Sequence, residues 1–307
     1  MTASDRTLTL YDAFSEVPGG GSVAGVVGTA TGFSAERMQQ VATEVGAPAT
    51  CFVTGVDSGV VDVRFFSTLT EYPMCGHGTI AVFTWLVEEG RLVAGPEPEA
   101  VSWTLRTPGG TATVDVAARA DGRPEVMLAL GPTVAEPCPV DAPEVARLLG
   151  IGIGAVIEPL ALEAASADFT HLVVRVDGLA AIGRLSPDYA AVADLCRRIG
   201  ADTLAVFTPE TGDPAVTIRC RDFCPAVGTP EAAATGTTNR ALACHLVRSG
   251  LADVDADSPV VVVAAQGVEM GRPSLIRTEV VMVDGLPTRL HVGGVATRAS
   301  EGTVRMW

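Results

Sequence analysis

Residues 75–91 (CGHGTIAVFTWLVEEGR) decide the fold, because they recur in altered form at residues 235–251 (TGTTNRALACHLVRSGL). The two segments align without gaps at a constant offset of 160, and five of the seventeen positions are identical. The identical pairs are Gly76 and Gly236, Ala81 and Ala241, Leu86 and Leu246, Val87 and Val247, and Gly90 and Gly250. A repeat of this kind indicates the architecture of a chain before any local detail does.

The sequence around each segment repeats as well. A strand-like run precedes each one, VVDVRFF at residues 60–66 and AVTIRCR at residues 215–221. Further upstream, SAERMQQVATEVGAPATCFVT at residues 34–54 parallels SPDYAAVADLCRRIGADTLAVFT at residues 186–208. Both begin with serine at a predicted helix N-cap, show helical apolar spacing, pass a glycine and enter a short apolar strand. The shared order predicts an α+β protein.

We therefore expect two similar halves joined near residues 117–124 (AARADGRP), which are typical of a linker or turn. The first half comprises residues 1–118 together with residues 290–307, and the second comprises residues 119–289. Each half has β-branched strands against which its glycine-led helix is expected to pack.

The composition excludes several classes of function. The 307 residues include 21 basic and 36 acidic side chains, a net charge of −15, and all the basic ones are arginine. Without lysine there is no Schiff base to pyridoxal phosphate or a carbonyl substrate, and no P-loop lysine. The acidic balance argues against a nucleic-acid or membrane partner. No signal peptide is visible, and the most apolar run, residues 259–265, is too short to span a bilayer. A soluble, cytoplasmic protein is the expectation.

The cysteines and histidines do not form a scaffold. Seven cysteines form no CxxC pair, which favours reduced, mostly buried thiols over disulfides. Four histidines lie far apart and show no metal-ligand spacing. We expect no metal and no cofactor.

The starts of the two repeated helices are candidate anion sites. Small residues gather there, in Cys75 to Thr79 and in Thr235 to Asn239. Free N–H groups and the positive end of the helix dipole attract a negative group, and glycine lets it approach the backbone. Two such starts are expected to face each other across a cleft and hold one small carboxylate. The alternative is that both are ordinary capped helices.

Five motifs lie in one order along the chain. They are YDAF at residues 11–14, MQQVATE at 38–44, MCGHGT at 74–79, TGT at 235–237 and QGVEMGRPS at 266–274. Together they resemble the phenazine-biosynthesis PhzF-like family, which has the diaminopimelate epimerase-like fold. The resemblance implies two hotdog-like halves, each a curved sheet around a central helix, with the active site between them and a homodimer as the assembly.

Two departures from the family pattern concern acid and base groups. The family has a glutamate in S-E-T-x-F-V, whereas residues 48–53 here read PATCFV and place Ala49 at that position. The family has an aspartate in E-D-P-x-T-G-S, whereas residues 231–237 read EAAATGT and place Ala232 there. Since alanine carries no exchangeable proton, the family's glutamate-based isomerisation in phenazine formation is not carried over to this chain.

The remaining candidates for proton transfer are Cys75, His77 and Glu231. A helix start can lower the pKa of the Cys75 thiol, and the epimerase relatives use a cysteine there in each half. Because Thr235 occupies the second position here, stereoinversion by two thiols is disfavoured. His77 has an ordinary pKa near neutrality and suits a general acid or base. Its alternative role is to bond the nearby backbone, and Glu231 is a possible carboxylate near the second helix start.

Substrate contacts are expected from small residues of both helix starts. They are Gly76, Gly78, Thr79, Thr235, Gly236, Thr237 and Thr238. Glu71 and Tyr72 more simply fix the loop before the first helix, and His245 is interpreted as a packing residue. Arg272 is either structural or a partner for the acid of the substrate.

The sequence thus predicts a cofactor-independent isomerase that moves a proton, and with it a double bond. Its substrate is expected to be a small carboxylated, amino-acid-derived metabolite of specialised (antibiotic) metabolism, with a 4-alkylproline-type intermediate as one candidate. The alternatives are an amino-acid racemase or epimerase, a hydroxyproline dehydratase, and a binding protein of the same fold that has lost catalysis.

Overall fold

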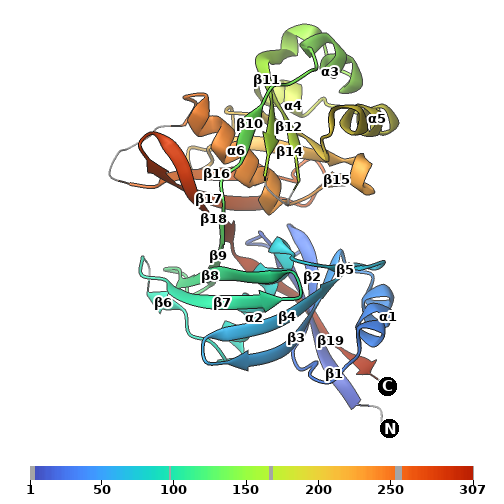
Figure 1. Ribbon diagram of the computed structural model, residues 1–307, viewed down its shortest axis with the longest axis vertical. Helices are drawn as coiled ribbons and strands as arrows, with labels where there is room; N and C mark the ends of the chain where they lie inside the picture. The colour runs from blue at the N-terminus through green and yellow to red at the C-terminus, as the bar shows by residue number, and fades with distance from the viewer. Residues whose placement is uncertain (1–3, 97, 166–168, 253–257, 307) are drawn as a thin grey trace. The chain divides into compact units, whose positions relative to one another are not determined.

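The computed structural model describes residues 4–96, 98–165, 169–252 and 258–306 (Figure 1). Its internal contacts divide the chain into two units. Unit 1 comprises Met1–Ala129 and Gly293–Trp307, and unit 2 comprises Leu130–Val292. Residues 119–129, expected in the second half, therefore belong to unit 1, and residues 290–292, expected in the first half, belong to unit 2. The reason is local: residues 119–123 form the turn of an antiparallel hairpin and not a linker between units.

Unit 1 alternates strands and helices. Its elements are β1 (Ser4–Ala13), β2 (Ser22–Val27), α1 (Ala35–Val45), β3 (Ala49–Asp57), β4 (Val60–Phe66), β5 (Glu71–Tyr72), α2 (Gly76–Glu88), β6 (Gly95–Pro96), β7 (Val101–Thr107), β8 (Gly110–Ala118), β9 (Pro124–Leu130) and β19 (Ala296–Met306). Strand β1 pairs antiparallel with β2 and β19. The ladder then runs parallel from β2 to β3, antiparallel to β4 and β5, parallel from β4 to β7 and antiparallel to β8.

Unit 2 repeats this order of pairings. Its elements are β10 (Val134–Glu136), α3 (Ala142–Leu148), η1 (Ile153–Ala155), β11 (Val156–Ala164), β12 (His171–Val176), α4 (Gly178–Ile182), α5 (Tyr189–Ile199), β13 (Thr203–Thr208), β14 (Ile218–Cys224), η2 (Pro225–Val227), β15 (Thr229–Ala232), α6 (Gly236–Arg248), β16 (Val260–Gln266), β17 (Ser274–Val283) and β18 (Leu286–Gly294). Strand β11 is antiparallel to β12, β12 is parallel to β13, and β13 is antiparallel to β14. Strand β14 is antiparallel to β15 and parallel to β16, which is antiparallel to β17.

Helices α1 and α5, which correspond in the two repeated segments, each end at a glycine, as the sequence predicted. Gly46 after α1 and Gly200 after α5 have φ of 71° and 72°, left-handed values that glycine adopts without strain. Ser34 is the predicted N-cap of α1 and accepts from the Arg37 N–H at 3.3 Å. The prediction for Ser186 was wrong, since Asp188 caps α5 and accepts from the N–H of Ala191 at 3.1 Å.

The two predicted strand runs differ in accuracy. Strand β4 has the predicted bounds, whereas β14 begins at Ile218, three residues after the predicted start. Residues 213–216 form a turn first, because the Asp213 side chain accepts from the Ala215 N–H and the Val216 N–H bonds back to the Asp213 carbonyl. The strand therefore starts only where pairing with β13 becomes possible.

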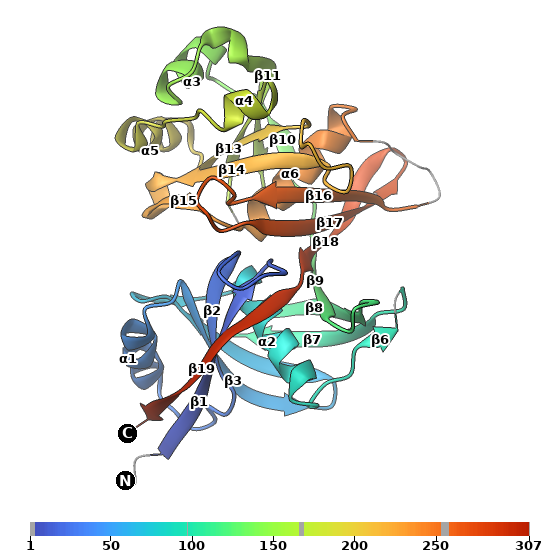
Figure 2. The same cartoon turned by 180° about the vertical axis from the view of Figure 1, so that it is seen from behind.

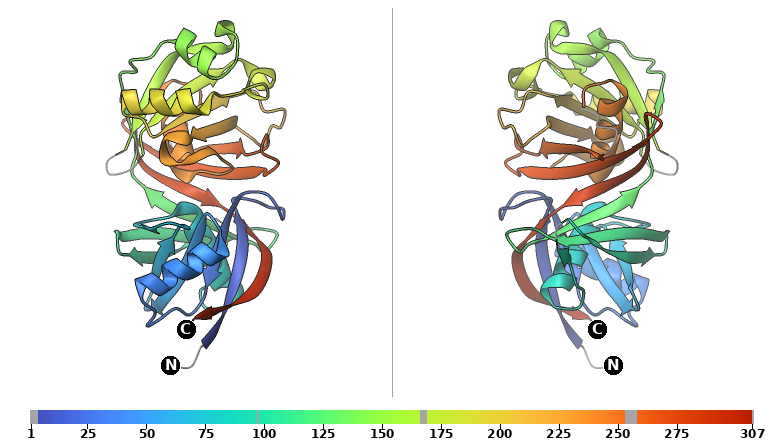
Figure 3. Two further views of the ribbon diagram at one scale, coloured as in Figure 1. Left: turned by 90° about the vertical axis from the view of Figure 1, so that its right-hand side faces the viewer. Right: turned by 90° about the vertical axis from the view of Figure 1, so that its left-hand side faces the viewer.

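Each central strand is covered by helices on both faces (Figures 2 and 3). All six residues of β13 are buried. Leu204 and Val206 pack in a core with residues of α5, whereas Ala205 and Phe207 pack in a second core with residues of α6. In unit 1, Phe52 of β3 packs with Met38 and Val41 of α1, while α2 contacts β1, β2 and β3. Helices α2 and α6 are buried nearly all round, as expected for helices enclosed by a sheet.

Candidate active site

Cys75 and His77 lie together at the start of α2. Cys75 is the N-cap residue, and its extended backbone (φ −146°, ψ 110°) places the thiol beside the first turn of the helix. The Sγ atom lies 3.5 Å from Nδ1 and 3.8 Å from Nε2 of His77. The thiol is buried and the imidazole is half-buried. A thiol in contact with an imidazole is able to exchange a proton with it.

Burial changes the pKa of Cys75 and the pKa of His77 from what the sequence indicated, which was a lowered value for the thiol and a value near neutrality for the imidazole. Desolvation raises the pKa of Cys75 to about 12, although the nearby N–H of Gly78 acts in the opposite direction. The expected lowering by the helix start is therefore outweighed by loss of water. Desolvation also lowers the pKa of His77 to about 4. At neutral pH the pair consists of a protonated thiol, which is a proton donor, and a neutral imidazole, which is a proton acceptor.

The other small residues at the start of α2 have different surroundings. Gly76 faces open space, so a ligand can approach its backbone. Thr79 is fully buried, and its hydroxyl donates to the Cys75 carbonyl at 2.8 Å. Gly78 packs against β3 and β4, where an added Cβ would lie 2.8 Å from Cys51 Sγ and 3.0 Å from the Phe65 ring. Of Gly76, Gly78 and Thr79, only Gly76 therefore leaves open space where a ligand could lie against the backbone.

We expect Gly78→Ala to destabilise unit 1 by about 1–3 kcal/mol, the typical cost of overpacking a core. Alanine's higher helix propensity offsets part of that loss. Replacing Cys51 by alanine removes the Sγ atom that the new methyl group would meet. The double variant Gly78→Ala/Cys51→Ala is therefore expected to unfold at a higher denaturant concentration than the single variant Gly78→Ala. The measurement is chemical denaturation of the two variants and Cys51→Ala alone. Additive losses would contradict the proposed contact.

The start of α6 has the same backbone geometry but a different set of partners. Thr235 is its N-cap, with φ −139° and ψ 107°. The Gln266 side chain donates to the Thr235 hydroxyl at 3.2 Å and accepts from the Thr235 N–H at 3.3 Å. Asn239 donates to the Thr235 carbonyl at 2.9 Å and to Gln266 Oε1 at 2.8 Å. Gly236 and Thr237 are half-buried. Gln266, from β16, was missed as a neighbour of this helix start.

Glu231 lies in a buried ion pair. Its carboxylate accepts two hydrogen bonds from the Arg221 guanidinium, each at 2.8 Å, and the two side chains are 8% and 9% exposed. Arg221 also donates to the carbonyls of Ile182 and Leu185 and lies over the ring of Phe223. A carboxylate held on both oxygens by one guanidinium has little freedom to move a proton. The geometry favours a structural role over the predicted catalytic one.

Unit 1 contains a similar pair. Glu71 accepts two hydrogen bonds from Arg64, each at 2.7 Å, and Arg64 lies over the ring of Phe66. This pair joins β4 to β5 directly before α2, in keeping with the expectation that Glu71 fixes the loop.

A second polar cluster at the start of α6 contains Thr238, one of the predicted substrate contacts, together with three side chains that the sequence did not indicate. The Thr238 hydroxyl donates to Asp222 Oδ2 at 2.8 Å, and the His171 ring lies 2.8 Å from the Thr203 hydroxyl. All four side chains are buried. Burial raises the pKa of Asp222, while hydroxyls of Thr235, Thr238 and Thr203 act in the opposite direction. No local motif indicated the cluster, because its members come from four separate elements.

We expect His171 to make the protein sensitive to acid. Burial, with the nearby Arg240 guanidinium, lowers its pKa to about 3 in the folded protein, against about 6.5 in the unfolded chain. Between these values the unfolded chain takes up a proton that the folded protein does not, so stability falls as the pH falls. At pH 5 the loss from His171 is about 2 kcal/mol.

Urea unfolding at pH 7.5 and pH 5 checks this expectation in the protein and in His171→Asn. The variant should lose about 2 kcal/mol less between the two pH values. The raised pKa of Asp222 contributes with the opposite sign, since its protonated form is favoured in the folded state. That contribution is present in both proteins, so the difference between them isolates His171. Equal losses would show that His171 is not buried in its neutral form.

His245 has polar as well as apolar contacts. Its ring packs edge-on against Phe207 at 5.8 Å, in line with the packing role expected, and Nδ1 lies 3.6 Å from the buried carboxylate of Glu163. Arg248 and Thr133 also bond this carboxylate. The network ties the C-terminal end of α6 to β11, at the opposite end of the helix from its start.

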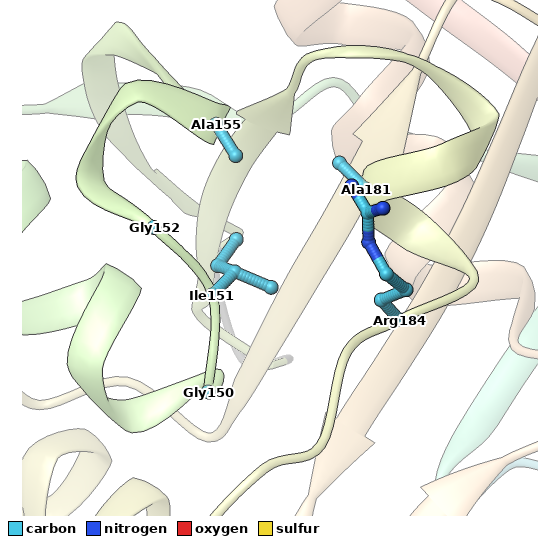
Figure 4. A pocket seen from close by; sticks show the side chains of 6 residues that line it. All are labelled: Gly150, Ile151, Gly152, Ala155, Ala181 and Arg184. Atoms are coloured by element: carbon cyan, nitrogen blue, oxygen red, sulfur yellow. The ribbon is translucent and has the colours of Figure 1, made fainter.

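A pocket of unit 2 is lined by none of the predicted residues (Figure 4). Its lining residues are Gly150, Ile151, Gly152, Ala155, Ala181 and Arg184. Within the part of the chain that the structure describes, no cluster of three or more His, Cys, Asp or Glu side chains is arranged to hold a metal ion. The seven cysteines are free thiols, and all but Cys138 are buried. None of the described helices is long and apolar enough to cross a membrane.

Known proteins resemble this chain over nearly its whole length. The profile of the family described as "Phenazine biosynthesis-like protein" (PhzC-PhzF) matches residues 11–302. An uncharacterized isomerase of Deinococcus radiodurans is 29% identical over 94% of this chain and 92% of its own. The trans-2,3-dihydro-3-hydroxyanthranilate isomerase of Pseudomonas chlororaphis is 28% identical over 96% of this chain and 98% of its own. A PhzF-family structure from Bacillus anthracis matches with a TM-score of 0.86 at 24% identity, covering 98% of this chain and 99% of that one. The predicted resemblance and the mixed α/β fold are confirmed.

Proposed function

The chain belongs to the PhzC-PhzF family of phenazine biosynthesis-like proteins, and from that membership we propose that it is a cofactor-independent isomerase. The reaction is the transfer of one proton, and with it one double bond, between two carbons of a small carboxylic acid. Relatives named as isomerases support the reaction class. The observation that carries the proposal within this chain is the contact between Cys75 Sγ and His77 Nδ1 at 3.5 Å.

The uncharged state of this pair suits a proton shift. The His77 imidazole takes the proton from an acidified substrate carbon and becomes imidazolium, while the electron pair of the broken C–H bond shifts along the double bond. The Cys75 thiol gives its proton to the second carbon and becomes thiolate. Transfer of the imidazolium proton to the thiolate, across the 3.5 Å contact, restores both groups. No oxidant, reductant or second substrate is needed.

The start of α2 also provides electrostatic support for the charges that form. The backbone N–H groups of its first turn and the helix dipole stabilise the transient thiolate. The open side of Gly76 admits a substrate carboxylate or delocalised anion to the same N–H groups. This arrangement uses the backbone in place of charged side chains.

The substrate class follows from the side chains that are missing. Ala49 is fully buried at the start of β3, directly opposite Ala24, and brings no carboxylate to the site. A substrate whose C–H bond is already acidified by a vinylogous imine or acid needs less help from the enzyme. We propose such an amino-acid-derived carboxylate, with the 4-alkylproline type as one candidate. A dimeric, cytoplasmic enzyme of specialised metabolism remains part of this proposal.

Proton exchange in D2O, followed by NMR, tests the function. The probes are trans-2,3-dihydro-3-hydroxyanthranilate, a 4-alkylidene-pyrroline-2-carboxylate, L-proline and trans-4-hydroxy-L-proline. The expected result is a shifted double bond with one deuterium incorporated, in the alkylidene probe above all. Exchange at the α-carbon of proline with inversion would establish a racemase instead. Absence of exchange with every probe, in a protein that binds them, would favour a binding protein.

A further inference from the structure

The backbone carbonyl of Cys75 accepts two hydrogen bonds from one residue. The Thr79 N–H donates to it at 2.9 Å, as in any α-helical turn, and the Thr79 hydroxyl donates to it at 2.8 Å. Because Thr79 is fully buried, its hydroxyl reaches the site through this carbonyl and not by contact with a substrate. The structure thus links a buried side chain to the N-cap residue that carries the proposed proton donor.

This second hydrogen bond is not a general property of buried threonines in α2. Thr84 lies in the same helix and is fully buried, but its hydroxyl has no hydrogen-bond partner among the residues that the structure describes. Threonine is also a poorer helix former than alanine, so helix stability alone does not favour it at position 79. The bond from the Thr79 hydroxyl is therefore a feature of the helix start.

Unit 2 makes the same bond with a different side chain. At the start of α6 the Thr235 carbonyl accepts from the Asn239 N–H at 3.1 Å and from Asn239 Nδ2 at 2.9 Å. Asn239 lies at the offset of 160 from Thr79 and is 1% exposed. A hydroxyl in one unit and an amide in the other thus bond the carbonyl at the same position of the repeated helix. The two helix starts share this hydrogen bond although they differ in residue type.

Holding the carbonyl also fixes the N–H of the next residue. The Cys75–Gly76 peptide unit is planar and trans, so its N–H points in the opposite direction from its C=O. The C=O points along the helix toward Thr79, and the Gly76 N–H therefore points out of the helix start, where Gly76 has open space beside it. Since hydrogen bonds in a chain polarise one another, donation to this carbonyl also makes the Gly76 N–H a stronger donor.

We propose that Thr79 is a positioning residue of the isomerase: by holding the Cys75 carbonyl, its hydroxyl keeps the Gly76 N–H directed at the substrate anion and the Cys75 thiol in contact with His77. This inference rests on the proposed function, in which backbone N–H groups stabilise the anion and Cys75 and His77 move the proton. Thr79 itself exchanges no proton with the substrate. The hydrogen bond maintains the extended N-cap backbone of Cys75, with φ −146° and ψ 110°.

Substitutions at position 79 test this role through kinetics with the alkylidene probe, below the melting temperature of each variant. Thr79→Val keeps the shape and removes the hydroxyl. It is expected to lower kcat about 10- to 100-fold, the scale of a misplacement of about 1 Å, with KM changed less than about threefold. Thr79→Ala, which favours the helix but also lacks the hydroxyl, should show a similar loss of kcat.

Thr79→Ser is the conservative variant that should rescue the rate. Because it keeps the hydroxyl, its kcat is expected within about threefold of the wild-type value. A merely structural hydroxyl would give a lower melting temperature in Thr79→Val with an unchanged kcat. That result, or a Thr79→Ser enzyme as slow as Thr79→Val, would overturn the proposal.

Thr84→Val is the matched control. It makes the same substitution in a buried threonine of the same helix, at a hydroxyl that lacks a partner in the described part of the chain. It should leave kcat unchanged and keep or raise the melting temperature, because a buried unsatisfied hydroxyl is removed. A kcat loss equal to that of Thr79→Val would assign both losses to packing in α2 and contradict the role of the hydrogen bond.

One NMR signal reports on the peptide unit without any substrate. Cys75–Gly76 is the only Cys-Gly pair in the sequence, so protein labelled with carbonyl-¹³C cysteine and ¹⁵N glycine gives a single HNCO signal. Loss of a hydrogen bond to a carbonyl moves its ¹³C resonance upfield. The signal should therefore move upfield in Thr79→Val and stay in place in Thr84→Val. An unmoved signal in Thr79→Val would show that the hydroxyl does not hold this carbonyl.

The outcomes separate this inference from the proposed function. If the wild-type enzyme isomerises no probe, the proposed function fails, and the role of Thr79 in catalysis fails with it. If the wild-type enzyme is active and Thr79→Val moves the NMR signal without lowering kcat, the function stands and Thr79 only stabilises the helix start.

Discussion

Replacement of Cys75 by alanine, or of His77 by asparagine, is expected to lower the isomerase rate by about 10²- to 10⁴-fold, the range that general acid and base groups contribute. The two side chains are 3.5 Å apart and divide one proton transfer between them. Without His77 the Cys75 thiol has no group that returns its proton, and without Cys75 the His77 imidazole has no partner that protonates the second carbon. The double variant should therefore be no slower than the slower single variant, because residues that act as a unit are not additive.

The measurement is kcat and KM on the alkylidene probe, with the melting temperature of each variant as a check on folding. Cys138→Ala is the matched control for the thiol, since Cys138 is half-buried in unit 2 and far in sequence from α2. It should keep the wild-type rate. If Cys75→Ala and His77→Asn also keep that rate, Cys75 and His77 are not the proton-handling pair.

Breaking the buried pair of Arg221 and Glu231 is expected to lower the free energy of unfolding by about 3–5 kcal/mol. In Arg221→Met the Glu231 carboxylate is left buried without its partner, and in Glu231→Gln the guanidinium loses its counter-charge. Replacing both at once, as Arg221→Met with Glu231→Leu, should be less damaging than either single change, because no unpaired charge remains. Chemical denaturation of the three variants measures the differences.

The pair of Arg64 and Glu71 in unit 1 provides the comparison. Its two hydrogen bonds have similar lengths, but the side chains are 26% and 28% exposed, against 9% and 8% for Arg221 and Glu231. Water therefore screens it more, and Glu71→Gln should cost at most about 1 kcal/mol. Equal losses in Glu71→Gln and Glu231→Gln would mean that burial does not decide the strength of these pairs.

Much of the fold was predictable because the chain repeats itself. Two weakly similar segments, each preceded by a strand and by a helix that ends at glycine, indicated the order of elements that the ladders have. Two predictions, the N-cap of α5 and the start of β14, were wrong because a nearby aspartate side chain forms a different local hydrogen bond. Pro187 and Asp188 follow Ser186, and Asp188 takes over as the cap. The side chain of Asp213 forms a turn before β14 can begin.

The site was predictable only in part. Cys75 and His77 are two residues apart at a helix start, so their proximity follows from local sequence. Asp222 of β14 bonds Thr238 of α6, and Glu231 of β15 pairs with Arg221 of β14, relations that no spacing along the chain reveals. The pKa directions also depend on burial, and a helix start alone does not indicate how much water the fold removes from Cys75.

The close packing of Gly78 on Cys51 makes the fitness effect of one position depend on the other. In such a pair the order of substitutions matters, and a smaller residue at position 51 has to precede a larger one at position 78. A mutant library that varies position 78 by itself will therefore undercount the acceptable side chains. A library that varies positions 51 and 78 jointly will recover them.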